Sequence, residues 1–299
     1  MKFAAIDIGS NAVRLLFCNV YDDNGKISYK KAELIRVPIR LGEDAFLHGK
    51  ITPEKIDKLI TAMKAFKYLM DVYEAFGYRA CATSAMREAT NRDEIILRIK
   101  NETGINIEII DGKTEADIIY SNHIEEHLDK NNNYLYVDIG GGSTEITLFS
   151  KNKAVVSQSF NVGTIRMLHN QIEKEYWSEF KNWIQENTKG YKPLIAIGSG
   201  GNINKLFKMS GRKTNKPVST VKIKNLYEEL ESHTYEERMH IFGLNPDRAD
   251  VIIPASKILL TVLKKAAIEK IIIPQIGLSD GIVHQLYEKY KKEKLELKV

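Results

Sequence analysis

The sequence predicts an α/β protein built from two halves of related design, and three observations support this. An apolar run, an Asp-Ile-Gly triplet, small polar residues and a second apolar run occur around residues 7–11 and again around residues 138–145. That order is typical of a strand, a tight glycine turn and a second strand. In both halves, strand-like runs and helix-period segments then alternate, as they do in α/β folds.

The first half is expected to begin with this hairpin over residues 2–20, followed by a strand over 27–40. A Thr-Pro-Glu sequence at 52–54 supplies an N-cap, a proline at the first helical position and an acid in the first turn. Apolar residues at helical spacing then predict an amphipathic helix over 53–76. The other expected elements are a strand over 79–83, a loop carrying Ser84, Arg87 and Glu88, a helix over 92–103, a strand over 105–110 and a helix capped by Thr114 that runs to about 128.

The second half is expected to repeat this order. Its later elements are a strand over 155–160, a helix over about 164–187, a strand over 194–197, a glycine turn at 198–202 that opens into a helix, helices over about 224–232, 235–242 and 246–267, and a strand over 271–273. Polar residues over 129–133 separate the halves, so we expect domains of 1–122 and 123–299. A lysine-rich helix over about 280–297 is expected to pack back onto the first domain.

Composition is ordinary for a soluble globular protein, with 299 residues, 43% hydrophobic and 28% charged. No apolar run approaches the ~20 residues that span a bilayer, and no signal-peptide pattern is present, so we expect no membrane partner and a cytoplasmic protein. Cys18 and Cys81 lie in apolar runs and are expected to be reduced core residues. A net charge of +5 is too mild for a dedicated nucleic-acid binder but suits a polyanionic substrate.

The turn at Gly140, Gly141 and Gly142 has the chemistry of a phosphate cradle. Glycine has no Cβ and tolerates positive φ, so several backbone N–H groups can converge on one ligand. Asp138 and Glu145 flank this turn, and two carboxylates there would repel an anion unless a divalent cation lay between them. The pattern therefore predicts a site for phosphate and metal.

Seven short motifs, taken in order, resemble the exopolyphosphatase/guanosine pentaphosphate phosphatase family. They are Asp7-Ile-Gly-Ser-Asn11, Thr83-Ser-Ala-Met-Arg87-Glu-Ala, Gly112-Lys-Thr-Glu115-Ala, Asp138-Ile-Gly-Gly-Gly-Ser-Thr-Glu145, Gly163-Thr-Ile-Arg166, Gly198-Ser-Gly-Gly-Asn202 and Arg248-Ala-Asp-Val-Ile252. The resemblance spans residues 3 to about 282 and implies an actin/hexokinase/Hsp70-like (ribonuclease H-like) fold, with duplicated domains and an active-site cleft between them.

Cleavage of a phosphoanhydride needs a cation, hydrogen-bond donors for phosphate oxygens and a base that orients water. We expect Asp7, Asp138 and Glu145 to hold Mg²⁺, with Mn²⁺ as the alternative ion. One of them, Asp7 above all, could instead only bond the N–H groups of its own turn. The resemblance implies that Glu115 is the general base for in-line attack of water, and Glu145 is the rival candidate. Asp138 completes the catalytic set.

Phosphate oxygens are expected to contact two arginines and three turns. Arg87 and Arg14 can each form bidentate contacts, although strand alternation could equally point Arg14 at solvent, and Arg166 is a weaker third candidate. The other expected ligands are Ser10, Asn11, Gly140, Gly141, Gly142, Ser143, Thr144, Gly200 and Gly201. The last two open a helix, whose N-terminus favours anions.

The leading functional interpretation is a Mg²⁺-dependent exopolyphosphatase that releases terminal phosphate from inorganic polyphosphate. Hydrolysis of the 5′-phosphate of pppGpp is the alternative, since the family covers both. Two hypotheses assign the protein to other functional classes. One is a kinase or ATPase that acts on the γ-phosphate of ATP, and the other is a non-catalytic regulator that binds (p)ppGpp or polyphosphate. The resemblance also implies a homodimer.

Overall fold

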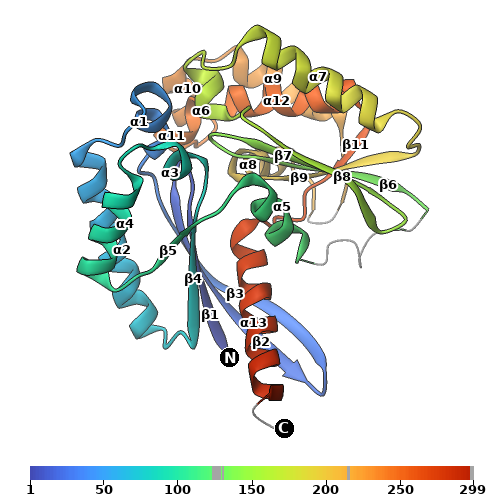
Figure 1. The fold of residues 1–299 in the computed structure, drawn as a ribbon. Coiled ribbons are helices and arrows are strands. Elements are labelled where there is room, and N and C mark those ends of the chain that lie inside the picture. Colours follow the sequence, from blue (N-terminus) through green and yellow to red (C-terminus); the bar gives the residue numbers. More distant parts are fainter. Residues whose placement is uncertain (123–128, 130, 214–215, 297–299) are drawn as a thin grey trace. The chain divides into compact units, whose positions relative to one another are not determined.

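The computed structural model describes residues 1–122, 129, 131–213 and 216–296. The chain divides into two compact units (Figure 1). Unit 1 contains Met1–Asn122 and the segment Leu278–Val299, and unit 2 contains His123–Gly277. Each unit has its own buried apolar core, one around Ile6, Leu15 and Met63 and the other around Val137, Phe180 and Leu259.

Unit 1 is built on a sheet of strand order β3-β2-β1-β4-β5. Its strands are β1 Lys2–Ile8, β2 Val13–Asp23, β3 Lys26–Val37, β4 Gly77–Ala82 and β5 Ile107–Ile109. The first three form an antiparallel meander, whereas β4 runs parallel to β1 and β5 runs parallel to β4. The predicted first hairpin is thus confirmed, and β1 is buried along nearly all of its length.

The helices of unit 1 differ from the expected pattern at four places. They are α1 Leu41–His48, α2 Pro53–Val72, α3 Ser84–Glu88, α4 Arg92–Thr103, α5 Gly112–Tyr120 and α13 Leu278–Glu296. No sequence signal had indicated α1. Helix α2 ends at Val72, four residues before the predicted end at 76. Residues 84–88 form a short helix rather than a loop. Thr114 was the wrong cap for α5, because the side chain of Asp111 accepts a hydrogen bond from the Thr114 N–H at 2.7 Å and thereby starts the helix three residues earlier.

The C-terminal helix α13 belongs to unit 1, where it packs against β1, β2, β4 and α5. Its aromatic side chains Tyr287 and Tyr290 lie against Phe3 of β1, and the Tyr287 hydroxyl donates to Asp22 at 2.7 Å. Gly281 permits the approach to α5, because a Cβ there would lie 1.9 Å from the carbonyl oxygen of Ile118. The part of the predicted helix over 114–128 that follows Asn122 falls on residues 123–128, outside the described residues.

Unit 2 repeats the layout of unit 1 with a sheet of order β10-β11-β9-β6-β7-β8. Its strands are β6 Asn133–Ile139, β7 Thr144–Ser150, β8 Lys153–Phe160, β9 Leu194–Ser199, β10 Val218–Ser219 and β11 Lys270–Ile272. Strands β6, β7 and β8 form an antiparallel meander, and β9 and β11 run parallel to β6. The shared layout confirms the predicted α/β fold with two related halves.

The helices of unit 2 cover this sheet in shorter pieces than expected. They are α6 Thr164–Leu168, α7 Lys174–Thr188, α8 Gly201–Met209, α9 Thr220–Glu231, α10 Tyr235–His240, α11 Pro246–Ala249 and α12 Ile252–Lys265. The single helix predicted over 164–187 is interrupted because Asn170 has a φ of 55°, a left-handed conformation that a right-handed helix cannot include. The helix predicted over 246–267 is likewise split into α11 and α12.

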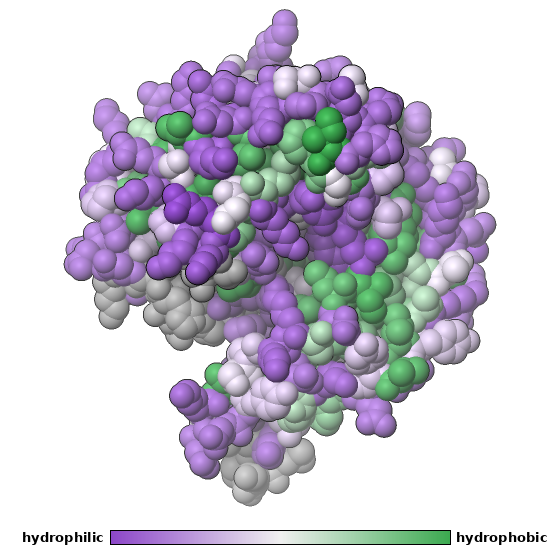
Figure 2. All heavy atoms as spheres, turned by 180° about the vertical axis from the view of Figure 1, so that it is seen from behind, coloured by the Kyte–Doolittle hydropathy of each residue, from purple (hydrophilic) through white to green (hydrophobic). Residues whose placement is uncertain are grey.

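Hydrophilic residues dominate the face seen in Figure 2, and hydrophobic residues gather there in smaller areas. Among the described residues, none of the helices combines the length and the apolar character needed to cross a membrane. Cys18 and Cys81 are buried free thiols.

Candidate active site

The carboxyl ends of the parallel strands of unit 1 gather three segments at one edge of the sheet. The Thr83 N–H donates to the Ile8 carbonyl at 3.1 Å, and the Ile110 N–H donates to the Ala82 carbonyl at 3.0 Å. These bonds continue the ladder past the strand ends. The turn after β1, the start of α3 after β4 and the start of α5 after β5 therefore lie side by side, at the edge where α/β folds usually bind ligands.

The first glycine turn is held from two sides. Gly9 closes it by donating to the carbonyl of Ala12 at 3.2 Å. The carbonyls of Ser10 and Asn11 accept from the N–H groups of Gly42 and Arg40, at 2.8 and 3.0 Å. The Ser10 hydroxyl is buried and lies 3.4 Å from the hydroxyl of Ser84 on α3.

Asp7 and Arg14 face each other across the β1–β2 ladder and form an ion pair. Nη1 of Arg14 lies 2.7 Å from Oδ2 of Asp7, and the side chains are 31% and 5% exposed. Arg14 thus contacts the buried carboxylate of Asp7 while its side chain keeps partial exposure, and its contact with phosphate stays a prediction. The ion pair also places a cation beside the carboxylate expected to help bind metal.

Arg87 joins α3 to the start of α5. Its Nη1 donates to the Ile110 carbonyl at 2.7 Å, directly before the cap residue Asp111. Two bonds from Thr114 hold the pKa of Asp111 below its usual value, and the positive charge of Arg87 adds to this. A guanidinium carries five N–H donors, so a bond to one carbonyl is compatible with phosphate binding.

Glu115 lies half-buried in the first turn of α5, where its N–H donates to the Asp111 carbonyl at 2.9 Å. Its carboxylate and that of Asp7 both act on the thiol of Cys81. Burial raises the pKa of Cys81 to about 12, Arg79 opposes this, and the negative charges of Glu108, Asp7 and Glu115 add to it. Asp7 and Glu115 are thus within electrostatic reach of one buried side chain at the same edge of the sheet.

The second glycine turn has its carbonyl oxygens tied to α6. The N–H groups of Thr164 and Ile165 donate to the carbonyls of Gly140 and Gly141, at 3.0 and 2.8 Å, and Nε of Arg166 donates to the carbonyl of Gly142 at 2.8 Å. In a planar trans peptide the N–H points away from the C=O that precedes it. The N–H groups of the three residues that follow these carbonyls, Gly141, Gly142 and Ser143, are therefore directed away from α6, as a phosphate cradle requires.

Two residues of this region support the turn. Arg166, considered as a phosphate ligand, is 9% exposed and uses its guanidinium to hold the Gly142 carbonyl. Thr144 is fully buried, and its hydroxyl donates to the carbonyl of Val162. Gly163 allows α6 to approach, because a Cβ there would lie 2.3 Å from the Gly141 carbonyl oxygen.

Asp138 and Glu145 are directly opposite each other in the β6–β7 register, so their side chains project from the same face of the sheet. Glu145 is 3% exposed and accepts a hydrogen bond from the Ser159 hydroxyl at 2.8 Å. Adjacent carboxylates repel unless a cation or donors lie between them. Because Mg²⁺ takes one or two carboxylates and keeps several waters, this pair suits it. Within the described part of the chain, no cluster of three or more His, Cys, Asp or Glu side chains forms a complete metal cage.

The third glycine turn lies against Asp138. Gly200, with a φ of 109°, follows β9, and a Cβ on it would lie 2.6 Å from the Ile139 carbonyl oxygen and 3.3 Å from Oδ1 of Asp138. Nη1 of Arg248 donates to the carbonyl of Gly201 at 2.7 Å, at the start of α8. Gly200 and Gly201 thus share one sheet edge with Asp138.

Sequence reasoning missed Ser159 as a partner of Glu145. The only local signal was its alternating position on β8, opposite Glu145 in the β7–β8 register. It also assigned no role to Arg248.

Comparison with known proteins gives a family match over most of the chain. A family model described as the Ppx/GppA phosphatase family matches residues 32–290. A bifunctional 3-dehydroquinate synthase/phosphatase of Fusobacterium nucleatum is 33% identical over 87% of this chain, which spans 43% of that relative. Exopolyphosphatase 2 of Mycobacterium tuberculosis is 24% identical, with 95% of this chain and 98% of the relative covered. A guanosine-5′-triphosphate,3′-diphosphate pyrophosphatase of Vibrio cholerae is 24% identical, with 97% and 60% covered.

Solved structures agree with the fold. The crystal structure of an exopolyphosphatase from Cytophaga hutchinsonii superposes with a TM-score of 0.84 at 25% identity, covering 97% of this chain and 98% of that one. The Ppx/GppA family member of Aquifex aeolicus gives a TM-score of 0.74 at 26% identity, with the same coverage. The predicted fold class is confirmed.

Proposed function

The chain belongs to the Ppx/GppA phosphatase family, and we propose that it is an exopolyphosphatase that hydrolyses the terminal phosphoanhydride of inorganic polyphosphate. The observation that supports this most directly is the turn at Gly140, Gly141 and Gly142, whose carbonyls are all bonded on the α6 side. The N–H groups of Gly141 and Gly142 thereby point away from α6, next to a pair of carboxylates, whereas the Gly140 N–H closes the turn by donating to the Ser143 carbonyl at 2.9 Å.

The pair Asp138 and Glu145, together with Asp7, would hold the Mg²⁺ ion. When bound, this ion neutralises charge on the phosphate oxygens. Arg14 already balances the charge of Asp7, so we propose that Asp7 acts on the metal through water.

We propose that the remaining groups bind and orient the substrate and the attacking water. The N–H groups of the two glycine turns and the guanidinium of Arg87 donate to phosphate oxygens. Glu115, at the N-terminus of α5, takes a proton from water as the nucleophile attacks in line with the anhydride bond.

A phosphate-release assay in Mg²⁺ tests the proposal with short polyphosphate, long polyphosphate, pppGpp and ATP side by side. We expect release from polyphosphate. Release from pppGpp alone would support the alternative suggested by the Vibrio cholerae relative. Formation of ADP from ATP would indicate a kinase or ATPase, and binding of polyphosphate without turnover would indicate a regulator; either result would overturn the proposal. The homodimer remains part of this proposal, and light scattering of the purified chain tests it.

A further inference from the structure

The first glycine turn is attached to the start of helix α1 through Arg40. This residue has a φ of 59°, a left-handed conformation that is unfavourable for a residue with a Cβ. In this conformation its N–H donates to the Asn11 carbonyl at 3.0 Å, while its own carbonyl accepts from Nζ of Lys55 at 2.9 Å. Strained backbone of this kind persists only where the surroundings hold it in place.

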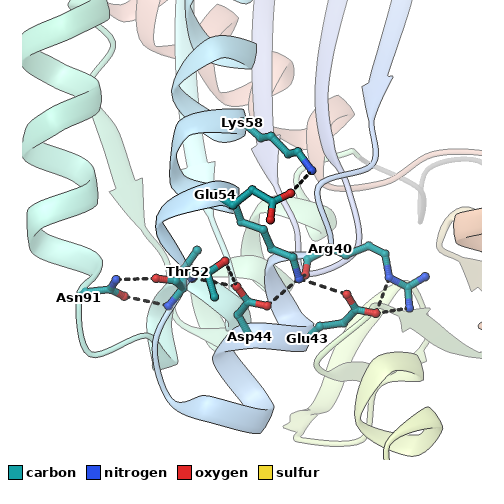
Figure 3. A network of polar contacts seen from close by, with 9 residues as sticks. Arg40, Glu43, Asp44, Thr52, Glu54, Lys58 and Asn91 are labelled. Carbon is teal, nitrogen blue, oxygen red and sulfur yellow. Dashed lines mark hydrogen bonds and ion pairs between the residues drawn. The ribbon is translucent and has the colours of Figure 1, made fainter.

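The side chains around Arg40 supply that support (Figure 3). Nε and Nη2 of Arg40 each lie 2.7 Å from Oε1 of Glu43. Nζ of Lys55 on α2 lies 3.1 Å from Oε2 of Glu43 and 2.7 Å from Oδ1 of Asp44. The other oxygen of Asp44 accepts from the N–H and the hydroxyl of Thr52, at 2.9 and 2.6 Å. We call Arg40, Glu43, Asp44, Thr52 and Lys55 the α1 clamp.

The α1 clamp differs from an exposed ion pair on α2, the helix that carries Lys55. Lys58 and Glu54 also lie 2.7 Å apart, but their side chains are 62% and 77% exposed, and such pairs contribute little. The side chain of Lys55 is 18% exposed and its ammonium contacts three acceptors, which uses all of its donors. Without this ammonium, the buried carboxylate of Asp44 would lose the cation that pairs with it, and Glu43 would keep Arg40.

We propose that the α1 clamp positions the first glycine turn for phosphate, with Lys55 as its central positioning residue. The proposal rests on the proposed function of that turn. The link is direct, because the N–H of Gly42, in the first turn of α1, donates to the Ser10 carbonyl at 2.8 Å. A shift of α1 would therefore move Ser10 and Asn11, two of the proposed phosphate ligands.

Two variants on one helix provide a matched comparison, Lys55→Met in the α1 clamp and Lys58→Met outside it. Each removes one positive charge from α2. In the substrate-free protein, amide hydrogen exchange resolved by NMR reports on the bonds of Gly9, Arg40 and Gly42. We expect these amides to exchange at least ~10-fold faster in Lys55→Met, because their acceptors are no longer held. Lys58→Met should match the wild type.

Kinetics separate positioning from general support of the fold. Small misplacements of a binding group cost up to about 100-fold in rate, so kcat per folded molecule should fall roughly 10-fold or more in Lys55→Met, with a smaller change in KM. Lys55→Arg, which keeps the charge, should recover part of this loss. If Lys55→Met does not fold, Asp44→Asn replaces it with the same two measurements.

Equal exchange and equal kcat in the Lys55 and Lys58 variants would overturn the proposal. So would faster exchange with unchanged kcat, since the turn would then tolerate the movement. If the wild type releases no phosphate, the proposed function fails. Exchange in the free protein then decides the inference alone: unchanged rates at Gly9, Arg40 and Gly42 overturn it, and faster rates retain the link between α1 and the turn.

Discussion

At the level of single residues, the candidate site is defined by how its charges are partnered. Asp7 lies beside Arg14, and Glu145 accepts from Ser159. Both carboxylates are only 3% exposed, and these contacts compensate for the loss of water around them. A buried charge is tolerated only when it is paired or hydrogen-bonded. Glu115 is less buried than these two carboxylates.

Glu115→Gln tests the assignment of the general base. The amide keeps the shape of the side chain but cannot accept the proton, so phosphate release should fall at least ~100-fold while substrate affinity stays within a fewfold. Single-turnover kinetics and equilibrium binding of polyphosphate measure the two quantities. Asp117→Asn, on the exposed side of the same helix, is the control and should keep wild-type turnover. Normal turnover in the Glu115 variant would show that Glu115 is not the general base, and Glu145 would then be the next candidate.

The hydrogen bonds and the ion pair of Asp44 should make the free energy of unfolding depend on pH. Burial raises the pKa of this carboxyl, but bonds from Lys55 and Thr52 outweigh burial and hold the pKa below its usual value of 3.8. A group whose pKa is lower in the folded state contributes stability above the unfolded pKa and loses that contribution as pH falls through the folded pKa. The difference in unfolding free energy between wild type and Asp44→Asn should therefore be full at pH 7 and shrink below about pH 4. Urea unfolding at pH 7, 5 and 3 measures it, and a constant difference would contradict the assignment.

At the level of elements, each glycine turn depends on the helix that packs behind it. Helix α1 holds the turn of unit 1 through the carbonyls of Ser10 and Asn11, and α6 holds the turn of unit 2 through three glycine carbonyls. The two helices use different residues, but both hold the carbonyl groups of a glycine turn. Backbone carbonyls are fixed on one side, so the N–H groups face the other.

Gly163→Ala tests this dependence. Its Cβ would meet the Gly141 carbonyl oxygen at 2.3 Å and the Gly142 carbonyl carbon at 2.4 Å, so the turn has to move. Overpacking of this kind costs about 1–3 kcal/mol of stability, and displacement of the cradle should lower phosphate release roughly 100-fold. Gly77→Ala is the control, because its Cβ would meet Phe3 at an ordinary 3.7 Å. Chemical unfolding and phosphate release measure both effects, and wild-type activity in Gly163→Ala would contradict the role of the α6 contact.

At the level of the whole molecule, two units with the same sheet layout each carry a glycine turn after their first strand. Helix α13 returns the C-terminal segment to unit 1, so the chain passes through unit 2 and back. The feature to test at this scale is the metal of the proposed function.

Removal of metal should abolish activity without unfolding the protein. We expect EDTA to stop phosphate release and added Mg²⁺, or Mn²⁺, to restore it, because neither unit contains a complete cage among its described residues and the carboxylates act on the substrate through the ion. Circular dichroism should be unchanged by EDTA, since each unit has its own apolar core. Full activity in EDTA would exclude the proposed metal site.

The sequence by itself determined the two hairpins, the α/β alternation and the positions of the glycine turns. Hydrophobic periodicity and glycine chemistry are local properties, so they can be read within a short window. It also identified α4 at its observed bounds, Arg92–Thr103. Helix α1 was not predicted. Its first residue follows Arg40, whose left-handed backbone conformation is held by a hydrogen bond from Lys55 on another helix.

Only the tertiary structure decided which side chains meet. It paired Arg14 with Asp7, used Arg166 to hold the Gly142 carbonyl and brought Ser159 to Glu145. The physical reason is that these contacts depend on strand register and on the packing of helices distant in sequence. A hydrogen bond needs its donor and acceptor within about 3 Å, a condition that no local pattern of residues expresses.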